Sequence, residues 1–135
     1  MIKKNPKFDL ELRKKSIAGL SRAAIMLQSE IKKTLSGSSP SSPGKPPGVK
    51  SGSLRRSIQS VRKDDFTRQV GSGLKYAAAQ EFGSVISAKS GALKFQLKDK
   101  SWRTVKSVIL PARPYLRPTL AKSKQKILKA FCSVK

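Results

Sequence analysis

The groups in this chain that could do chemistry are carboxylates, amines, guanidinium groups and hydroxyls, because its 135 residues include no histidine. Histidine is the commonest general base and the usual partner of a serine or cysteine nucleophile. Asp64 and Asp65 are the only adjacent acids among seven, and neighbours in a turn do not face each other across a substrate as a glycosidase pair does. Gly71-Ser72-Gly73-Leu74-Lys75 lacks the spacing of a phosphate-binding loop. The sequence therefore predicts no catalytic residues and no enzyme.

Cys132 is the single cysteine, so the chain cannot form an intramolecular disulfide. A structural zinc site would need ligands that a chain without histidine does not readily supply. We therefore expect no metal and no cofactor, and we expect Cys132 to be a small buried apolar residue.

The net charge points to a polyanionic partner. Thirty Lys and Arg residues against seven Asp and Glu give +23 at pH 7. Nucleic acid, an anionic membrane or an acidic protein could supply the counter-charge. The chain has no run of 18 apolar residues, and charged residues stand near its start where a signal peptide would be apolar. We expect no membrane partner, synthesis in a cytoplasm, and nucleic acid as the polyanion.

Two rows of apolar residues at helical spacing predict a long helix over residues 6–35: Leu10, Ile17, Ala24 and Ile31, with Leu20, Leu27 and Leu35 beside them. Asn5 can cap this helix, and Pro6 suits its first position. Gly19 lies inside it and is either a tolerated glycine or the mark of a close approach by a neighbouring backbone.

A long loop follows over residues 36–53, because four prolines forbid helix and central strand while serine and glycine favour extended chain. A structureless loop of this length inside a compact domain is usually functional or disordered. Two interpretations stay open, a passive linker and a mobile arm that orders on a partner.

The rest of the sequence predicts two hairpins and two helices. Residues 58–70 form the first hairpin with its turn at 63–65, and residues 76–82 form a short helix that stops at Gly83. Alternating residues 93–97, a turn at 99–101 and a return strand at 104–110 form the second hairpin.

A final helix begins near Leu116 and runs to about Val134, with an apolar face of Leu120, Ile127, Phe131 and Val134. The expected fold is α+β and occupies one domain, residues 1–135. An antiparallel sheet of two hairpins is packed by the long N-terminal helix, the short middle helix and the C-terminal helix.

Three stretches, in this order, resemble small neck proteins of long-tailed bacteriophages. The first is Pro43-Gly44-Lys45-Pro46-Pro47 with Ser51-Gly52-Ser53-Leu54-Arg55-Arg56-Ser57-Ile58. The second is Tyr76-Ala77 with Glu81-Phe82-Gly83, and the third is Leu110-Pro111-Ala112-Arg113-Pro114-Tyr115-Leu116-Arg117-Pro118. This chain departs from the family pattern at Thr119, where a small residue is common, at Tyr115, where Phe is frequent, and in its unusually basic charge.

The resemblance implies a tail-completion or head–tail joining protein without catalysis, whose subunits form a ring, typically of six, at the top of the tail tube. It implies a virion protein of the neck, assembled in the bacterial host cytoplasm. Its partners would be copies of itself, the connector or stopper, the tail tube or tail terminator protein, and double-stranded DNA in transit.

Such a ring would meet DNA through lysines that contact phosphates without reading bases. We expect the DNA-facing residues to be Lys45, Lys50, Lys122, Lys126 and Lys129. We expect the subunit interface to include Tyr76, Glu81, Phe82, Arg113, Tyr115 and Arg117. Glu81 could pair with Arg113 or Arg117, within the subunit or across an interface. Trp102 and Tyr115 are expected to pack in the core rather than to stack on bases.

Two other functions stay open on the sequence. The charge alone would also fit a free-standing, non-specific nucleic-acid-binding protein. A basic toxin or nuclease-like enzyme is the third hypothesis, and the missing catalytic groups argue against it.

Overall fold

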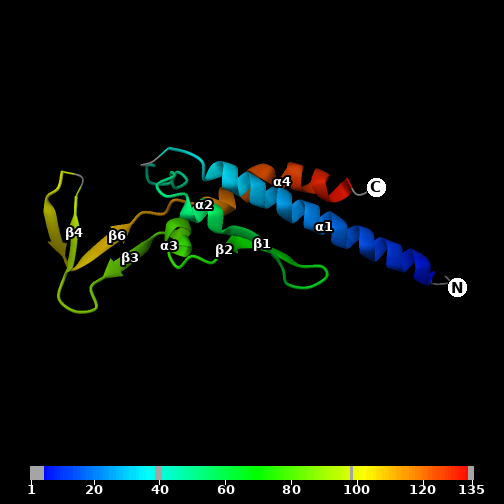
Figure 1. Cartoon of the computed structure of the whole chain (residues 1–135), viewed down its shortest axis with the longest axis horizontal. Coiled ribbons are helices and arrows are strands. Elements are labelled where there is room, and N and C mark those ends of the chain that lie inside the picture. Colours follow the sequence, from blue (N-terminus) through cyan, green and yellow to red (C-terminus); the bar gives the residue numbers. More distant parts are fainter. Residues whose placement is uncertain (1–4, 39–40, 98, 134–135) are drawn as a thin grey trace.

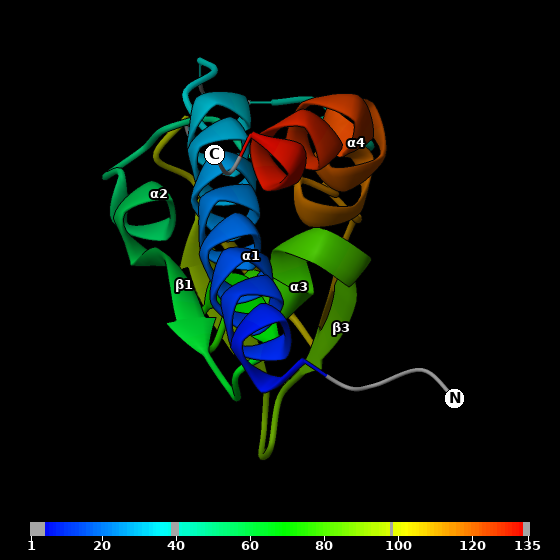
Figure 2. The same cartoon turned by 90° about the vertical axis from the view of Figure 1, so that its right-hand side faces the viewer.

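The computed structural model describes residues 5–38, 41–97 and 99–133. Its backbone is organised by two antiparallel helices, α1 (Pro6–Thr34) and α4 (Leu116–Cys132), which lie side by side in Figure 1. Viewed roughly along α1, α4 lies on one side of this helix and strand β1 (Ile58–Arg62) on the other (Figure 2). Helix α1 is therefore the central element against which the rest of the body packs.

Helix α1 begins where the sequence predicts. The Asn5 side chain accepts hydrogen bonds from the backbone N–H groups of Lys7 and Phe8, at 3.1 and 3.4 Å, and Pro6 occupies the first turn. The helix ends at Thr34, one residue before the predicted end. Helix α4 begins at Leu116 as predicted, and Val134, its predicted end, lies outside the described residues.

The predicted apolar face of α4 is wrong. Leu120 is 50% exposed and Phe131 is 39% exposed, whereas the buried residues of α4 are Thr119 and Ser123. Small side chains stand here because α1 and α4 approach closely: a Cβ added at Gly19 would lie 2.7 Å from the Phe131 carbonyl oxygen. Gly19 therefore marks a close backbone approach, the second of the two interpretations of this residue.

The core is small and lies around the C-terminal half of α1. Ile31, Leu35, Ile58 and Tyr115 are buried against one another, and four partly buried residues pack around them: Leu27, Leu54, Val70 and Leu116. The predicted stripe of α1 holds along this half only. Leu10 is 53% exposed, because the first turns of α1 extend beyond α4 (Figure 1).

The first predicted hairpin is confirmed. Strand β1 pairs antiparallel with β2 (Arg68–Ser72), with Ser60 opposite Val70, and this ladder packs against α1. Asp64 and Asp65 form its turn. The Asp64 side chain accepts from the N–H of Phe66, and Asp65 forms ion pairs with Arg62 and with Arg13 of α1. The ion pair between Asp65 and Arg13 thus holds the turn against α1.

The second predicted hairpin is longer than the sequence suggested. The predicted strand 104–110 is divided at Lys106 into β5 (Trp102–Val105) and β6 (Ser107–Leu110). Strand β5 pairs with β4 (Leu93–Gln96), and β6 pairs with β3 (Ser84–Ser87), a strand that the sequence analysis missed. We call residues 84–110 the arm, because they project away from the helices at the left of Figure 1.

The fold class is α+β, as predicted, but the strands form three separate two-stranded ladders rather than one sheet. The helices cover only the β1–β2 ladder. Two short helices, α2 (Ser53–Ser57) and α3 (Ala77–Phe82), connect the ladders to the body. The loop before α2 is held to the body where Gly44 N–H donates to the Ala112 carbonyl, and it closes on itself where Val49 N–H donates to the Gly37 carbonyl, each at 2.9 Å.

Replacing Gly19 by valine tests the helix contact. The new side chain would meet the α4 backbone, so we expect Gly19→Val to lower the free energy of unfolding by about 1–3 kcal/mol. Urea unfolding measures this loss. Ala18→Val, at the exposed neighbouring position, controls for the cost of a β-branched residue in a helix. Equal losses in both variants would contradict a close approach at Gly19.

Candidate functional site

Glu81 holds the start of α4. Its side chain is buried, with 4% exposed, and its carboxylate accepts three backbone hydrogen bonds. The N–H groups of Tyr115 and Leu116 donate to Oε2 at 2.7 and 2.9 Å, and that of Arg117 donates to Oε1 at 3.1 Å. The first amides of a helix have no partner inside the helix, and Tyr115, at the capping position, offers no side-chain acceptor bond. Glu81 therefore caps α4 from another element.

Backbone contacts bring Glu81 to this position. Helix α3 ends at Gly83, whose φ of +74° is one that residues with a side chain rarely adopt. A Cβ at Gly83 would lie 2.9 Å from both the Leu110 carbonyl oxygen and the Ala112 nitrogen. One turn earlier, the Arg113 N–H donates to the Gln80 carbonyl at 2.7 Å. Helix α3 therefore lies directly against the segment that leads into α4.

The three stretches that resemble phage neck proteins meet at this place. Gly44 of the proline-rich loop bonds to Ala112, Gln80 of α3 bonds to Arg113, and Glu81 bonds to the first turn of α4. The bonded residues extend from Gly44 to Arg117, 73 positions apart in the sequence. The structure joins them into one local unit around the start of α4.

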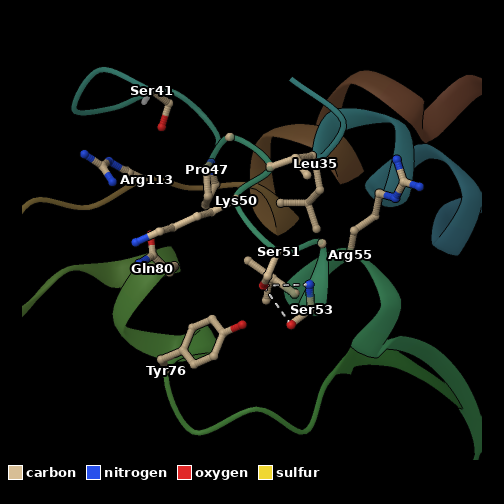
Figure 3. A pocket seen from close by; sticks show the side chains of 14 residues that line it. Leu35, Ser41, Pro47, Lys50, Ser51, Ser53, Arg55, Tyr76, Gln80 and Arg113 are labelled. Atoms are coloured by element: carbon tan, nitrogen blue, oxygen red, sulfur yellow. Dashed lines mark hydrogen bonds between the residues drawn. The ribbon is translucent and has the colours of Figure 1, made fainter. Parts of the chain in front are cut away.

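Beside this unit lies a pocket of about 290 Å³, shown in Figure 3. We call it the basic pocket, because Lys50, Arg55 and Arg113 line it and none of its lining residues is acidic. Lys50 lies beside Gln80 and on the same side as Arg113 in Figure 3, and the Tyr76 hydroxyl is directed toward Ser51 and Ser53. The Arg55 guanidinium points away from the interior, where Arg55 donates to the Ser36 hydroxyl at 3.1 Å.

Two polar atoms of this pocket are buried without a hydrogen-bond partner in the described part of the chain, Ser41 Oγ and Arg113 Nε. Buried polar groups are nearly always paired in folded proteins. The pocket therefore offers two donors, together with positive charge, to a group that the isolated subunit does not provide.

The expected ion pair of Glu81 with Arg113 or Arg117 does not form, because the Glu81 carboxylate is taken up by backbone amides. Arg117 instead lies over the Phe82 ring, 4.6 Å from its centroid. Glu81 and Tyr115 are buried within the subunit, whereas Tyr76, Phe82 and Arg117 are exposed. An interface role stays a prediction, and the exposed three are the residues that a neighbour could reach.

The five predicted DNA-facing lysines are exposed, but they differ in their surroundings. Lys122, Lys126 and Lys129 follow one side of α4 at helical spacing, and Lys126 Nζ lies 3.2 Å from Glu30 Oε2. Hydrogen bonds from Lys33 and then Lys126 lower the pKa of Glu30. Lys45 and Lys50 lie in the proline-rich loop, and only Lys50 lines the basic pocket. Their contact with DNA stays a prediction.

Two expectations about packing are wrong, and one is confirmed. Tyr115 is 1% exposed and belongs to the core, as expected, but Trp102 of the arm is 68% exposed. Cys132 is also exposed rather than buried, although its neighbours Phe131 and Ser133 contact Gly19 and Arg22 of α1. Burial raises the pKa of Tyr115 to about 12, and the negative charge of Glu81 adds to this rise.

Within residues 5–38, 41–97 and 99–133, no three side chains of the metal-binding types come close enough together to hold an ion. Across the same residues, no helix combines the length and the apolar character needed to span a bilayer.

Comparison with known families decides the assignment. Residues 1–83 match the family described as "Bacteriophage HK97-gp10, putative tail-component". The chain belongs to this family. No curated protein and no solved structure matches the chain. The HK97-gp10-like region covers α1, the proline-rich loop, the β1–β2 hairpin and α3, so it includes Glu81 but not the helix start that Glu81 caps. Membership identifies the chain as a component of a phage tail, a structural protein of the virion.

Replacing Glu81 by glutamine tests the cap. The amide keeps the shape of the side chain but loses the charge, and its NH₂ group cannot accept the bond from Arg117 while its oxygen faces Tyr115 and Leu116. We expect Glu81→Gln to lower the free energy of unfolding by about 2 kcal/mol, measured by urea unfolding. Asp64→Asn removes the charge of an exposed carboxylate, keeps the oxygen that accepts from Phe66 N–H, and serves as the control. A Glu81→Gln variant as stable as this control would contradict the cap.

The raised pKa of Tyr115 predicts a loss of stability at high pH. The folded-state pKa of about 12 lies above the ordinary value of about 10, so the contribution of Tyr115 is fully present below pH 10 and is lost as the pH rises toward 12. In Tyr76→Phe, Tyr115 is the only tyrosine, and its phenolate absorbance should appear with a midpoint near 12. The midpoint should return to about 10 in guanidinium. A midpoint near 10 in the folded protein would show that Tyr115 is not buried.

Proposed function

We propose that this HK97-gp10-like chain is a non-enzymatic, ring-forming subunit of the phage neck. It completes the tail or joins it to the head, at the top of the tail tube, and the ring lets DNA pass. Its neighbours are further copies of itself, the connector or stopper on one side, and the tail tube or tail terminator on the other. Assembly takes place in the cytoplasm of the bacterial host.

The observation that carries this proposal is the arm. Isolated two-stranded ladders are marginally stable in water, and the helices of this subunit leave both ladders of the arm uncovered. Its large apolar residues face solvent: Val85 is 64%, Trp102 is 68% and Ile109 is 75% exposed. Apolar surface of this kind is typical of a protein–protein contact. A subunit built in this way is completed by its neighbours, as a ring component is.

Charge supports the passage of DNA. Each subunit carries +23, so a ring of several copies needs a polyanion to offset repulsion between its own subunits. Lysines on the exposed side of α4 and in the loop would contact phosphates at any register of the duplex, without reading bases. We assign Lys122, Lys129 and Lys45 to this role ahead of Lys126, because Lys126 already forms an ion pair with Glu30.

Native mass spectrometry and electron microscopy of the purified chain test the ring. We expect a closed oligomer, with six copies as the expected number, and the same protein at the head–tail junction of phage particles labelled through a small tag. Absence from the particle, together with no ring alone or with neck partners, would contradict the proposal.

The same preparation tests the alternative, a free-standing nucleic-acid-binding protein, which the charge alone favours. That function predicts tight DNA binding by the monomer, with an affinity that falls steeply between low and physiological salt. A monomer that binds DNA in this way and is missing from the particle would replace the neck assignment.

A further inference from the structure

The basic pocket has the chemistry of a receptor for a carboxylate on an apolar peptide. Its cations, Lys50 and Arg113, lie on one side, and none of the described ion pairs involves them. Buried Ser41 Oγ and Arg113 Nε have no hydrogen-bond partner in the part of the chain that the structure describes. The remaining lining includes Leu35, Pro47 and Val49, so an acidic residue with apolar neighbours would satisfy both parts of the pocket.

One segment of this chain has the complementary composition. Residues 8–12 read Phe-Asp-Leu-Glu-Leu, five residues with two acids and no base in a chain of +23. Phe8, Leu10 and Leu12 are 62%, 53% and 54% exposed, and the carboxylates of Asp9 and Glu11 form no ion pair in the described structure. We call residues 8–12 the acidic tip of α1, because they form the free end of this helix (Figure 1).

A subunit cannot place its own acidic tip in its own basic pocket. The pocket adjoins Leu35, just beyond the C-terminal end of α1, whereas the tip lies at the N-terminal end. At 1.5 Å per residue, the straight helix holds the two about 35 Å apart. Any contact between them must therefore join two copies. Because the two surfaces differ, such a contact is head-to-tail and can be repeated around a ring.

We infer that the acidic tip of α1 of one subunit docks in the basic pocket of the next, with a carboxylate of Asp9 or Glu11 against Lys50 and Arg113. This inference rests on the proposed ring, for which it names the contact between subunits. The contact would supply the missing partners of the two buried donors and cover Phe8 and Leu12, which are four residues apart on one face of α1. It also gives Lys50 a protein partner in place of the DNA phosphate predicted from the sequence.

Charge-reversal substitutions in the full-length chain test the contact. Lys50→Glu and the pair Asp9→Lys/Glu11→Lys should each raise the dissociation constant between subunits tenfold or more, measured by mass photometry and sedimentation. Glu11→Lys alone keeps Asp9 in the first turn of α1 and should show a smaller loss in the same direction. The variant that combines Lys50→Glu with both tip substitutions should recover most of the affinity.

Lys63→Glu is the matched control, because Lys63 is an exposed lysine that does not line the pocket and is not among the residues assigned to DNA. It should leave the dissociation constant unchanged. Circular dichroism melting identifies any variant whose effect comes from unfolding, and the recovery in the combined variant cannot be produced by unfolding. An assembly that responds equally to Lys50→Glu and Lys63→Glu would overturn the inference and leave the ring itself standing.

Carbodiimide cross-linking provides a second readout in purified rings and in phage particles. This reagent joins an amine directly to a carboxylate, so we expect a bond between Lys50 of one copy and Asp9 or Glu11 of another. Cross-links from Lys50 to a different neck protein, or to none while other subunit contacts are captured, would overturn the inference. A chain that forms no ring and is missing from particles would instead overturn the proposed function.

Discussion

The fold of this subunit depends on one buried carboxylate. Glu81 accepts from the amide of Tyr115, the capping residue, and from those of Leu116 and Arg117, the first two residues of α4, where Tyr115 makes no side-chain capping bond. A carboxylate at a helix N-terminus meets unpaired N–H groups and the positive end of the helix dipole. Because Glu81 lies on α3, its bonds fix α4 relative to α3, and through Gly83 and Gln80 they fix the segment that carries Arg113. The position of α4 against α1, and one wall of the basic pocket, follow from this single interaction.

The rest of the molecule has a small core and exposed surfaces that suit contacts with neighbouring subunits. Among the described residues, the core is shared by the C-terminal half of α1, α2, the first hairpin and the start of α4. At one extremity the acidic tip of α1 stands free, and at the other the arm exposes apolar strands (Figure 1). Small cores stabilise small domains weakly, so covering these surfaces in an assembly also stabilises each subunit. A tail component with such a shape gains both stability and position from the same contacts.

The sequence predicted α1, its cap at Asn5, the first hairpin and the glycine stop of α3, because each depends on residues close together in the chain. It did not predict the role of Glu81, since a carboxylate that binds backbone amides needs no particular partner residue. The apolar face of α4 was wrong because Thr119 and Ser123 are the buried residues of this helix, with Thr119 bonded to Thr34 of α1, whereas Leu120 is exposed. Strand β3 and exposed Trp102 were missed because the arm has no core to impose a pattern of burial. The basic pocket could not be predicted, since it is formed by segments distant in sequence.

Hydrogen exchange at individual amides, followed by NMR on the unmodified protein, tests the central interaction most directly. If the Glu81 carboxylate holds the start of α4, the amides of Tyr115, Leu116 and Arg117 should exchange as slowly as those in the buried half of α1, because they open only with the whole domain. First-turn amides of a helix that lacks such an acceptor exchange rapidly. Rapid exchange at all three amides, with α1 still protected, would contradict the account.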